Sequence, residues 1–265
     1  MTAPDDGTGT PRLRDVTSTA PAVTRAAALL NVLAEPGADP MGLSDLARRL
    51  GLPKSSIANL CSALEGVGYV SRVDGRYELG PQLLALGGAY LRQSDDLSTF
   101  RDATKRLPVA SRETVQLGTL DGLNVVYLAR HDGTQPIRLA SDIGGRMPAV
   151  CTGLGKAMLA ELDPRVAEDR LRQVTVFPAL APNSIRNIPD LLAELERTRA
   201  RGYAIDDEEN TVGVMCFAVA LPGTDRSGRQ RAVSVTMLKA RSTEALRDAI
   251  VTDLQELARV LSPTL

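Results

Sequence analysis

The chain has 265 residues and a formal net charge of −1, with 31 Lys and Arg against 32 Asp and Glu. Its hydrophobic share of 43% is ordinary for a globular protein, and its length allows two domains with cores of their own. The longest apolar run, Val214 to Leu221, is too short to span a bilayer and predicts a buried strand. We therefore expect no membrane-spanning segment and no membrane partner.

Residues 1–21 are rich in Pro, Thr, Asp, Gly and Ala and carry no apolar helical stripe, which predicts a disordered tail. Asp5 and Asp6, together with the lack of an apolar core, argue against a signal peptide. These features favour a cytoplasmic protein.

The segment from 42 to 72 (GLSDLARRLGLPKSSIANLCSALEGVGYVSR) predicts two short helices around a tight turn. Ser44 is the expected N-cap of the first helix, and Gly51 is the expected end of it. The second helix has apolar residues at i, i+3, i+4 and i+7, which predicts a buried face made of Ile57, Leu60, Cys61 and Leu64. A further helix is predicted before this pair, over residues 23–33.

The opposite face of the second helix carries short hydrogen-bonding side chains in place of the Lys and Glu of an ordinary wet surface. These residues are Ser55, Ser56, Asn59 and Ser62, with Lys54 beside them. Such side chains suit the major groove, where base edges present donors and acceptors at close range. We therefore predict a DNA-binding helix-turn-helix with double-stranded DNA as its partner. The alternative is a three-helix unit that serves only in interaction or dimerisation.

A β-hairpin is predicted directly after the second helix. Asp74-Gly75 is a strong hairpin-turn signal between an extended run at 69–73 and a returning strand at 76–79. Three helices followed by a hairpin form the order of a winged helix-turn-helix, predicted over residues 22–80.

Basic residues on this unit are expected to contact the DNA backbone. Arg72 and Arg76 on the hairpin would meet phosphates or the minor groove, and Arg48 and Arg49 would touch the backbone from the first helix of the pair. From Arg25 to Arg92, however, seven basic and six acidic residues leave a net charge of only +1. Modest affinity per protomer is expected, with dimerisation supplying the rest.

Residues 81–96 are predicted to be a linker, with a helix over 81–93 whose leucines are available to a partner or to the second domain. The remaining residues, 97–265, predict an α+β domain with a mostly antiparallel sheet. Its strands are expected at 114–120, 123–130, 137–141, 203–205, 215–221 and 232–238. Its helices are expected at 97–106, 153–161, 165–173, 190–201 and 243–261.

Three segments of this domain carry polar groups that a pure core does not need. Residues 152–156 (TGLGK) open a helix, and free amides at a helix N-terminus attract anions. Residues 201–221 (RGYAIDDEENTVGVMCFAVAL) contain an acidic turn that enters an apolar strand, and Ser234 and Thr236 in residues 232–237 (AVSVTM) share one sheet face. Together they predict a site for a small polar ligand. The alternatives are a solvated loop for the acidic run and the solvent face of the sheet for the two hydroxyls.

No cofactor or metal site is predicted, because the three cysteines have neither pairing nor zinc-like spacing. The competing hypothesis is a hydrolase-type enzyme that uses Cys151 or Cys216 with His131, or the four carboxylates at 206–209. A single His without an oriented partner, and adjacent carboxylates that repel one another, weaken it. We expect that the protein is not an enzyme.

Four motifs, in this order, resemble the IclR family of bacterial transcriptional regulators across residues 22–262. They are LSDLARRLGLPKSSI, YELGPQLLALG, RMPAVCTGLGKAMLA and GYAIDDEENTVGVMCFAVAL. The resemblance implies a winged helix-turn-helix, a linker helix used in dimerisation, and a C-terminal effector-binding domain with a GAF-like fold. It also implies a homodimer or homotetramer that binds a small organic effector, often a carboxylic acid or an aromatic metabolite. Repression is expected in preference to activation.

By motif position, the resemblance also implies the residues of the effector pocket. These are Gly153, Leu154, Asp206, Cys216, Ser234 and Thr236, with Leu139 and Met147 as apolar walls. The chain departs from the family pattern at Asn59, where the family often has Arg, and at Thr236, where Ser is common. Met237 replaces a Gly.

Overall fold

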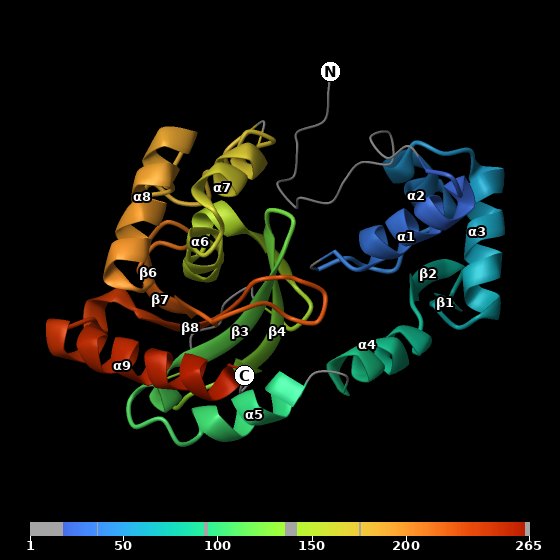
Figure 1. Cartoon of the computed structure of the whole chain (residues 1–265). Coiled ribbons are helices and arrows are strands. Elements are labelled where there is room, and N and C mark those ends of the chain that lie inside the picture. Colours follow the sequence, from blue (N-terminus) through green and yellow to red (C-terminus); the bar gives the residue numbers. More distant parts are fainter. Residues whose placement is uncertain (1–17, 36, 93–94, 136–141, 175, 263–265) are drawn as a thin grey trace. The chain divides into compact units, whose positions relative to one another are not determined.

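The computed structural model of the chain describes residues 18–262 apart from 36, 93–94, 136–141 and 175. These residues form two compact units, one of residues 18–92 and one of residues 95–262 (Figure 1). The first is helical with a small hairpin, and the second combines helices with one antiparallel sheet, so the predicted α+β class is confirmed. No helix of the described residues is long and apolar enough to cross a membrane.

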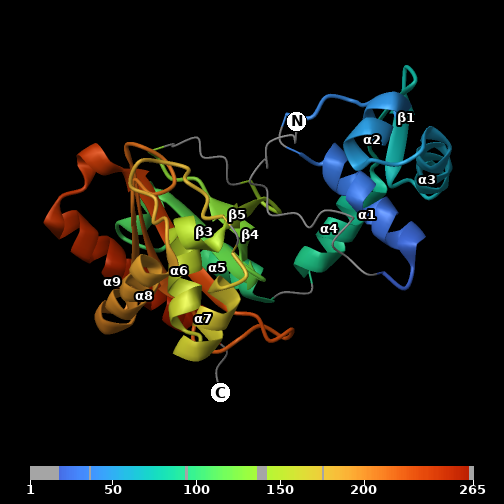
Figure 2. The ribbon, with the colours of Figure 1, turned by 90° about the horizontal axis from the view of Figure 1, so that it is seen from above.

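Three helices form the core of the described N-terminal unit: α1 (Pro21–Leu33), α2 (Leu43–Leu50) and α3 (Lys54–Gly66) (Figure 2). Gly51 ends α2 with a φ of 65°, as predicted. The expected Ser44 cap is wrong, because α2 begins at Leu43 and Gly42 is its N-cap. The helices pack on side chains that are 0% exposed: Leu29, Leu46, Ile57 and Cys61.

The hairpin consists of β1 (Val70–Val73) and β2 (Arg76–Leu79), which pair antiparallel. Asp74 (φ 50°) and Gly75 (φ 77°) both have positive φ, as a type I′ turn requires. Met41 and Tyr77 exchange two backbone hydrogen bonds of 2.9 and 2.8 Å, a bridge that the sequence did not predict. Helix α4 (Gln82–Arg92) follows, and none of its residues is buried.

The C-terminal unit is built on a six-stranded antiparallel sheet of order β5-β4-β3-β8-β7-β6. Its strands are β3 (Thr114–Asp121), β4 (Asn124–His131), β5 (Arg146–Pro148), β6 (Ala204–Asp207), β7 (Val214–Ala220) and β8 (Arg231–Leu238). The strand predicted at 137–141 lies outside the described residues. β4 pairs with β3 on one side and with the unpredicted β5 on the other.

Helices cover both faces of this sheet (Figure 1). One face carries α6 (Gly153–Ala160), α7 (Pro164–Leu171) and α8 (Ile188–Arg201), and the other carries α5 (Asp95–Thr104) and α9 (Glu244–Leu261). Short 3₁₀ turns lie at Ala110–Arg112, Ala149–Cys151 and Lys239–Arg241.

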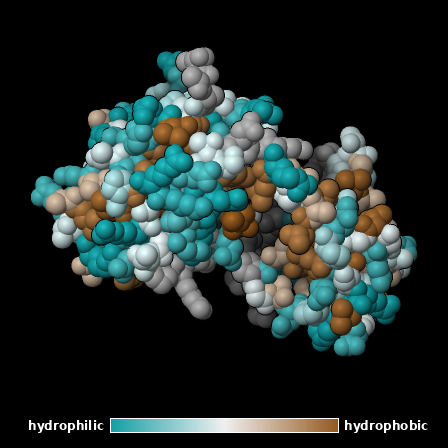
Figure 3. Space-filling model, turned by 90° about the horizontal axis from the view of Figure 1, so that it is seen from below, coloured by the Kyte–Doolittle hydropathy of each residue, from teal (hydrophilic) through white to brown (hydrophobic). Residues whose placement is uncertain are grey.

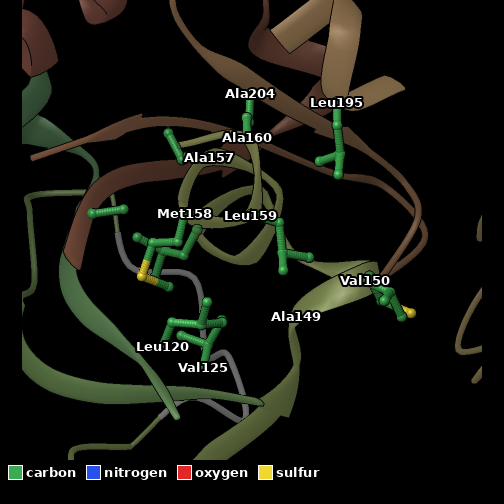
Figure 4. Packing of buried hydrophobic residues seen from close by; sticks show 14 of the residues in the cluster. Leu120, Val125, Ala149, Val150, Ala157, Met158, Leu159, Ala160, Leu195 and Ala204 are labelled. Carbon is green, nitrogen blue, oxygen red and sulfur yellow. The ribbon is translucent and has the colours of Figure 1, made fainter. Parts of the chain in front are cut away.

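Helix α6 is the centre of the core, since every one of its residues is buried. Figure 4 shows its Met158 and Leu159 beside Leu120 of β3 and Val125 of β4. A Cβ added at Gly155 would lie 2.1 Å from the Ala149 carbonyl oxygen, so only glycine fits there. The start of α6 is therefore fixed against the turn that precedes it.

Candidate functional site

The polar face predicted for α3 lies on the surface of the N-terminal unit. Lys54, Ser55 and Asn59 are exposed and Ser56 is half-buried, whereas Ile57 on the opposite face is buried. No side chain caps α3 at Pro53, and its first turn holds no acidic residue. Its first backbone N–H groups are therefore available to an anion such as a phosphate.

The basic residues of α2 are exposed and have acidic partners. Arg48 forms an ion pair of 2.7 Å with Asp45, and Arg49 pairs with Glu35. Within the part of the chain that the structure describes, Lys54 has no such pair. Exposed ion pairs contribute little to stability, about 0–1 kcal/mol each, so both arginines can exchange a carboxylate for a phosphate at small cost.

The two arginines of the hairpin are also exposed, and each has a contact within the unit. The guanidinium of Arg72 lies 5.6 Å from the centre of the Tyr77 ring. Arg76 Nη1 donates a hydrogen bond of 2.8 Å to the carbonyl oxygen of Pro40. Both contacts hold the side chains close to the hairpin and leave other guanidinium N–H groups for DNA.

A cavity with an empty volume of about 510 Å³, partly open to solvent, lies in the C-terminal unit where the start of α6 meets the sheet. Seven of the eight predicted effector residues line it: Met147, Gly153, Leu154, Asp206, Cys216, Ser234 and Thr236. The eighth, Leu139, lies outside the described residues. Thr152, from the predicted TGLGK segment, also lines the cavity, together with residues that the sequence did not predict: Gln116, Tyr127, Asn210, Thr211 and Val214.

Strand register brings together the residues that come from distant parts of the sequence. Asp206 on β6 is opposite Cys216 on β7, and Cys216 is opposite Thr236 on β8. Ser234, two residues earlier on β8, is opposite Gln116 on β3. Residues that alternate along a strand share one face, so these side chains form two adjacent rows beneath α6.

The start of α6 supplies backbone donors to this cavity. Thr152 is the N-cap, and its Oγ1 accepts a hydrogen bond of 3.0 Å from the Gly155 N–H. The N–H groups of Gly153 and Leu154 find no acceptor among the described residues. A Cβ added at Gly153 would lie 3.0 Å from Cys216 Sγ, so glycine lets the helix begin directly over β7.

Asp206 is a buried carboxylate in the cavity wall. Its Oδ1 accepts backbone hydrogen bonds from Glu209 (2.9 Å) and Asn210 (3.3 Å). Burial raises the pKa of Asp206 from 3.8 to about 6, although nearby Lys156 opposes the rise. The group is therefore charged at neutral pH and takes up a proton more readily than an ordinary aspartate.

The other three carboxylates of the acidic run form ion pairs with two lysines. Glu209 pairs with Lys156, which lies in α6 with none of its side chain exposed. Asp207 and Glu208 each lie 2.6 Å from Lys239 Nζ. The solvated-loop interpretation is wrong for Asp206 and Glu209, which are 6% and 9% exposed.

The hydroxyls of β8 are also buried, so their placement on a solvent face is wrong. Ser234 is 0% exposed and Thr236 is 5% exposed. By distance and angle the Ser234 Oγ has no hydrogen-bond partner among the described residues, although its hydroxyl and that of Thr236 lie close enough to Cys216 to moderate the raised pKa of that thiol. A buried hydroxyl without a partner is costly, and the cavity that it lines is the place where a ligand can satisfy it.

The residues of the hydrolase hypothesis are not assembled for catalysis. Burial raises the pKa of the Cys151 and Cys216 thiols to about 12, so neither is a thiolate at neutral pH. The His131 Nε2 lies 3.1 Å from the carbonyl oxygen of Ser111 and contacts neither thiol. Across the described ranges, no group of three or more His, Cys, Asp or Glu side chains is placed to hold a metal ion.

Comparison with known proteins identifies the family. The family model for the C-terminal domain of the bacterial transcriptional regulator IclR matches residues 88–263, and that for the IclR helix-turn-helix domain matches residues 22–74. The chain belongs to the IclR family. It is therefore a DNA-binding transcriptional regulator with a C-terminal effector-binding domain, and the hydrolase alternative is not supported.

Relatives align with most of this IclR-family chain. It is 31% identical to the HTH-type transcriptional regulator KdgR of Dickeya chrysanthemi over 225 residues, which are 84% of this chain and 73% of KdgR. It is 30% identical to the transcriptional repressor AllR of Escherichia coli K12 over 230 residues, 85% of this chain and 83% of AllR. The crystal structure of Thermotoga maritima IclR superposes with a TM-score of 0.65 at 28% identity and covers 90% of this chain and 98% of that one.

Proposed function

We propose that this regulator is a repressor whose operator affinity is set by a small organic acid bound in the cavity of the C-terminal unit. The observation that carries the proposal is the set of unpaired donors in the cavity wall: the Ser234 hydroxyl and the amides of Gly153 and Leu154. Its relative AllR is a repressor. We further infer that the protein acts in the cytoplasm, where its DNA target is.

On the DNA side, α3 enters the major groove by its N-terminal end. Ser55, Ser56 and Asn59 meet base edges, and Lys54 and the uncapped amides of α3 meet phosphates. The exposed arginines of α2 and the hairpin, Arg48, Arg49, Arg72 and Arg76, add backbone contacts. Two copies place their α3 helices about 34–36 Å apart, or a multiple of this, on a roughly palindromic operator.

On the effector side, the cavity presents donors that suit a carboxylate. The amides of Gly153 and Leu154 and the hydroxyls of Ser234 and Thr236 donate to its oxygens. No Lys or Arg is among the described lining residues, so the partial positive charge of the α6 N-terminus balances the anion. Asp206 then accepts a hydrogen bond from a second polar group. Met147 and Leu154 are apolar walls, with Leu139 assigned by resemblance alone.

Self-association is assigned to α4. Its Leu84 is 82% exposed, and Leu86 and Tyr90 are each 47% exposed. Figure 3, seen from the side on which α4 lies in Figure 1, shows apolar surface on the N-terminal unit. Burying such a helix face between two copies removes apolar surface from water and doubles the DNA contacts. A dimer, or a dimer of dimers, follows.

The effector proposal is tested with the full-length protein and the DNA upstream of its own gene. In gel-shift titrations, a panel of small organic acids should contain at least one that changes operator affinity by about 5–150-fold. Ser234→Ala should bind the operator as the unsubstituted protein does and lose this response. Equal affinity for random DNA, or a Ser234→Ala variant that responds in full, contradicts the proposal.

Leu84→Glu tests the role of α4 in self-association. In the monomer the new charge lies at an exposed position, but in the dimer it lies inside the proposed interface. Sedimentation velocity should therefore show a shift toward monomer. Val176→Glu is the control, because Val176 is also largely exposed, at 70%, and lies outside α4. If both variants sediment as the unsubstituted protein does, α4 is not the interface.

A further inference from the structure

We propose that Tyr127 determines effector specificity: its hydroxyl binds a polar group at the end of the effector that lies away from the carboxylate. This inference rests on the proposed function, because it needs a small acid in the cavity. It adds a residue that neither the motifs nor the family resemblance assigns, and it defines the second half of the ligand.

The lining residues come from strands at both sides of the cavity. The carboxylate-binding groups gather toward one side, since Gly153 lies against Cys216 on β7, and Ser234 and Thr236 belong to the adjacent β8. Tyr127 belongs to β4, which is separated from β6 and its Asp206 by β3, β8 and β7. Among the described strands, only β5 lies beyond β4, and it contributes Met147. Tyr127 is thus the polar group at the β4–β5 end of the cavity.

The Tyr127 side chain lies on the α6 face of the sheet. Val125, two residues earlier on the same strand, packs with Met158 and Leu159 of α6 in the core that Figure 4 shows, and Tyr127 belongs to the same cluster. The strand is held in place there, since the Tyr127 N–H donates to the Gly145 carbonyl (3.1 Å) and its carbonyl accepts from the Gly144 N–H (2.8 Å).

The Tyr127 hydroxyl is available to a ligand. The residue is only 5% exposed, and no described residue forms a hydrogen bond with its hydroxyl. Burial raises the pKa of Tyr127, and the charges of Cys216 and Asp206 across the cavity raise it further, so the hydroxyl remains protonated over the working pH range. It therefore offers a neutral donor that also accepts a hydrogen bond.

The Tyr127 hydroxyl distinguishes acids by the group that they carry at the end opposite the carboxylate. An acid with a hydroxyl, keto or amide group there pairs with Tyr127, whereas an acid with a methyl end leaves the buried hydroxyl without a partner. Sites of this kind reject ligands that lack the polar group, because the unpaired protein group makes binding less favourable. The effector is accordingly an acid with a polar group at each end.

The test compares matched acids on the full-length protein by isothermal titration calorimetry. The probes are ω-hydroxy acids from 3-hydroxypropionate to 6-hydroxyhexanoate, each beside the plain acid of equal length. The unsubstituted protein should bind the best hydroxy acid about tenfold more tightly than its plain partner. Tyr127→Phe should remove this preference and leave the affinity for the plain acid unchanged.

Tyr203→Phe is the matched control. Tyr203 is outside the cavity lining, lies 5.3 Å beneath the Arg201 guanidinium and packs near Phe217, so its variant should keep the preference. Ligand-free Tyr127→Phe should melt at or above the temperature of the unsubstituted protein, because no protein hydrogen bond is lost.

Three results overturn the inference alone: equal binding of both acids by the unsubstituted protein, a preference that persists in Tyr127→Phe, or a clear drop in that variant's melting temperature. If no acid of either kind binds to the unsubstituted protein, the proposed effector class fails together with the role of Tyr127.

Discussion

The face of α3 and the cavity beneath α6 present similar chemical groups in opposite settings. On α3, Ser55 and Asn59 are exposed and the core residues occupy the other side of the same helix. At the cavity, Ser234 and Asp206 are buried, and α6 supplies core and ligand-binding groups at once. A change on α3 therefore affects DNA binding with little effect on folding, whereas a change to the buried charged groups around the cavity also alters the free energy of unfolding.

The largest effect is expected for Lys156→Ala. It leaves Glu209 nearly buried without its partner, and breaking a buried ion pair on one side costs about 3–5 kcal/mol. Chemical denaturation should show this loss in the free energy of unfolding. The double variant Lys156→Met with Glu209→Gln removes both charges and should recover most of it. A single variant of unchanged stability contradicts the assignment of the pair.

Asp206→Asn should raise the free energy of unfolding at pH 8. This gain should disappear at acid pH. The folded-state pKa of Asp206 is raised from 3.8 to about 6. Its contribution to the free energy of unfolding is therefore complete below pH 3.8, where the group is protonated in both states, and is lost as the pH rises to about 6. The loss above pH 6 is about 3 kcal/mol at most, at 1.36 kcal/mol per pKa unit. The amide carries no charge and still accepts the Glu209 N–H hydrogen bond.

Urea unfolding of the Asp206→Asn variant and the unsubstituted protein at pH 4 and pH 8 measures this difference. The variant should also lose the effector response while it retains operator binding. A variant that is less stable than the unsubstituted protein at pH 8 contradicts the description of Asp206 as a carboxylate whose charged form is disfavoured by burial.

On the DNA side, Asn59→Ala should weaken operator binding by about 1–3 kcal/mol, the usual worth of one good base contact. Binding to random DNA and the melting temperature should stay the same, because Asn59 is exposed and lies away from the core. Gel-shift titrations on operator and random DNA give the ratio of the two affinities. Equal losses on both would falsify base recognition by this residue.

The smallest effect is expected for Lys54→Ala. A single phosphate contact carries no sequence information, so affinity should fall on all DNA alike, and the slope of log K against log salt should decrease by about 1. Fluorescence anisotropy at several salt concentrations measures this slope. Lys105→Ala, in the C-terminal unit, is the control, and its slope should be unchanged.

Local patterns were sufficient for most elements, whereas the full set of effector residues came from the family resemblance. The helix ending at Gly51 and the hairpin at Asp74-Gly75 depend on backbone preferences of those residues themselves, and both were predicted. The Met41–Tyr77 bridge and β5 were missed, because each pairs short segments that carry no periodic pattern of their own. Their existence depends on the partner strand.

At the cavity, the sequence indicated the residues that carry motif signals and missed Gln116 and Tyr127. Both belong to strands that read as ordinary buried segments, TVQLGTL and NVVYLAR. One signal was present: a Gln inside a central strand is expected to be buried and then needs a polar partner. Which face of the sheet adjoins the start of α6 is a tertiary fact that no local pattern contains. The roles of all these residues in binding stay predictions.

The contacts of Glu209 have a consequence for the energetics of recognition. Its side chain pairs with Lys156 on α6, its N–H donates to Asp206 on β6, and its carbonyl accepts a hydrogen bond of 2.6 Å from Ser184 Oγ. Helix, strand and loop are thus locked together before any ligand arrives. Such preorganisation spares the protein the conformational entropy of assembling a site, so even a metabolite of few atoms keeps most of its interaction energy as affinity.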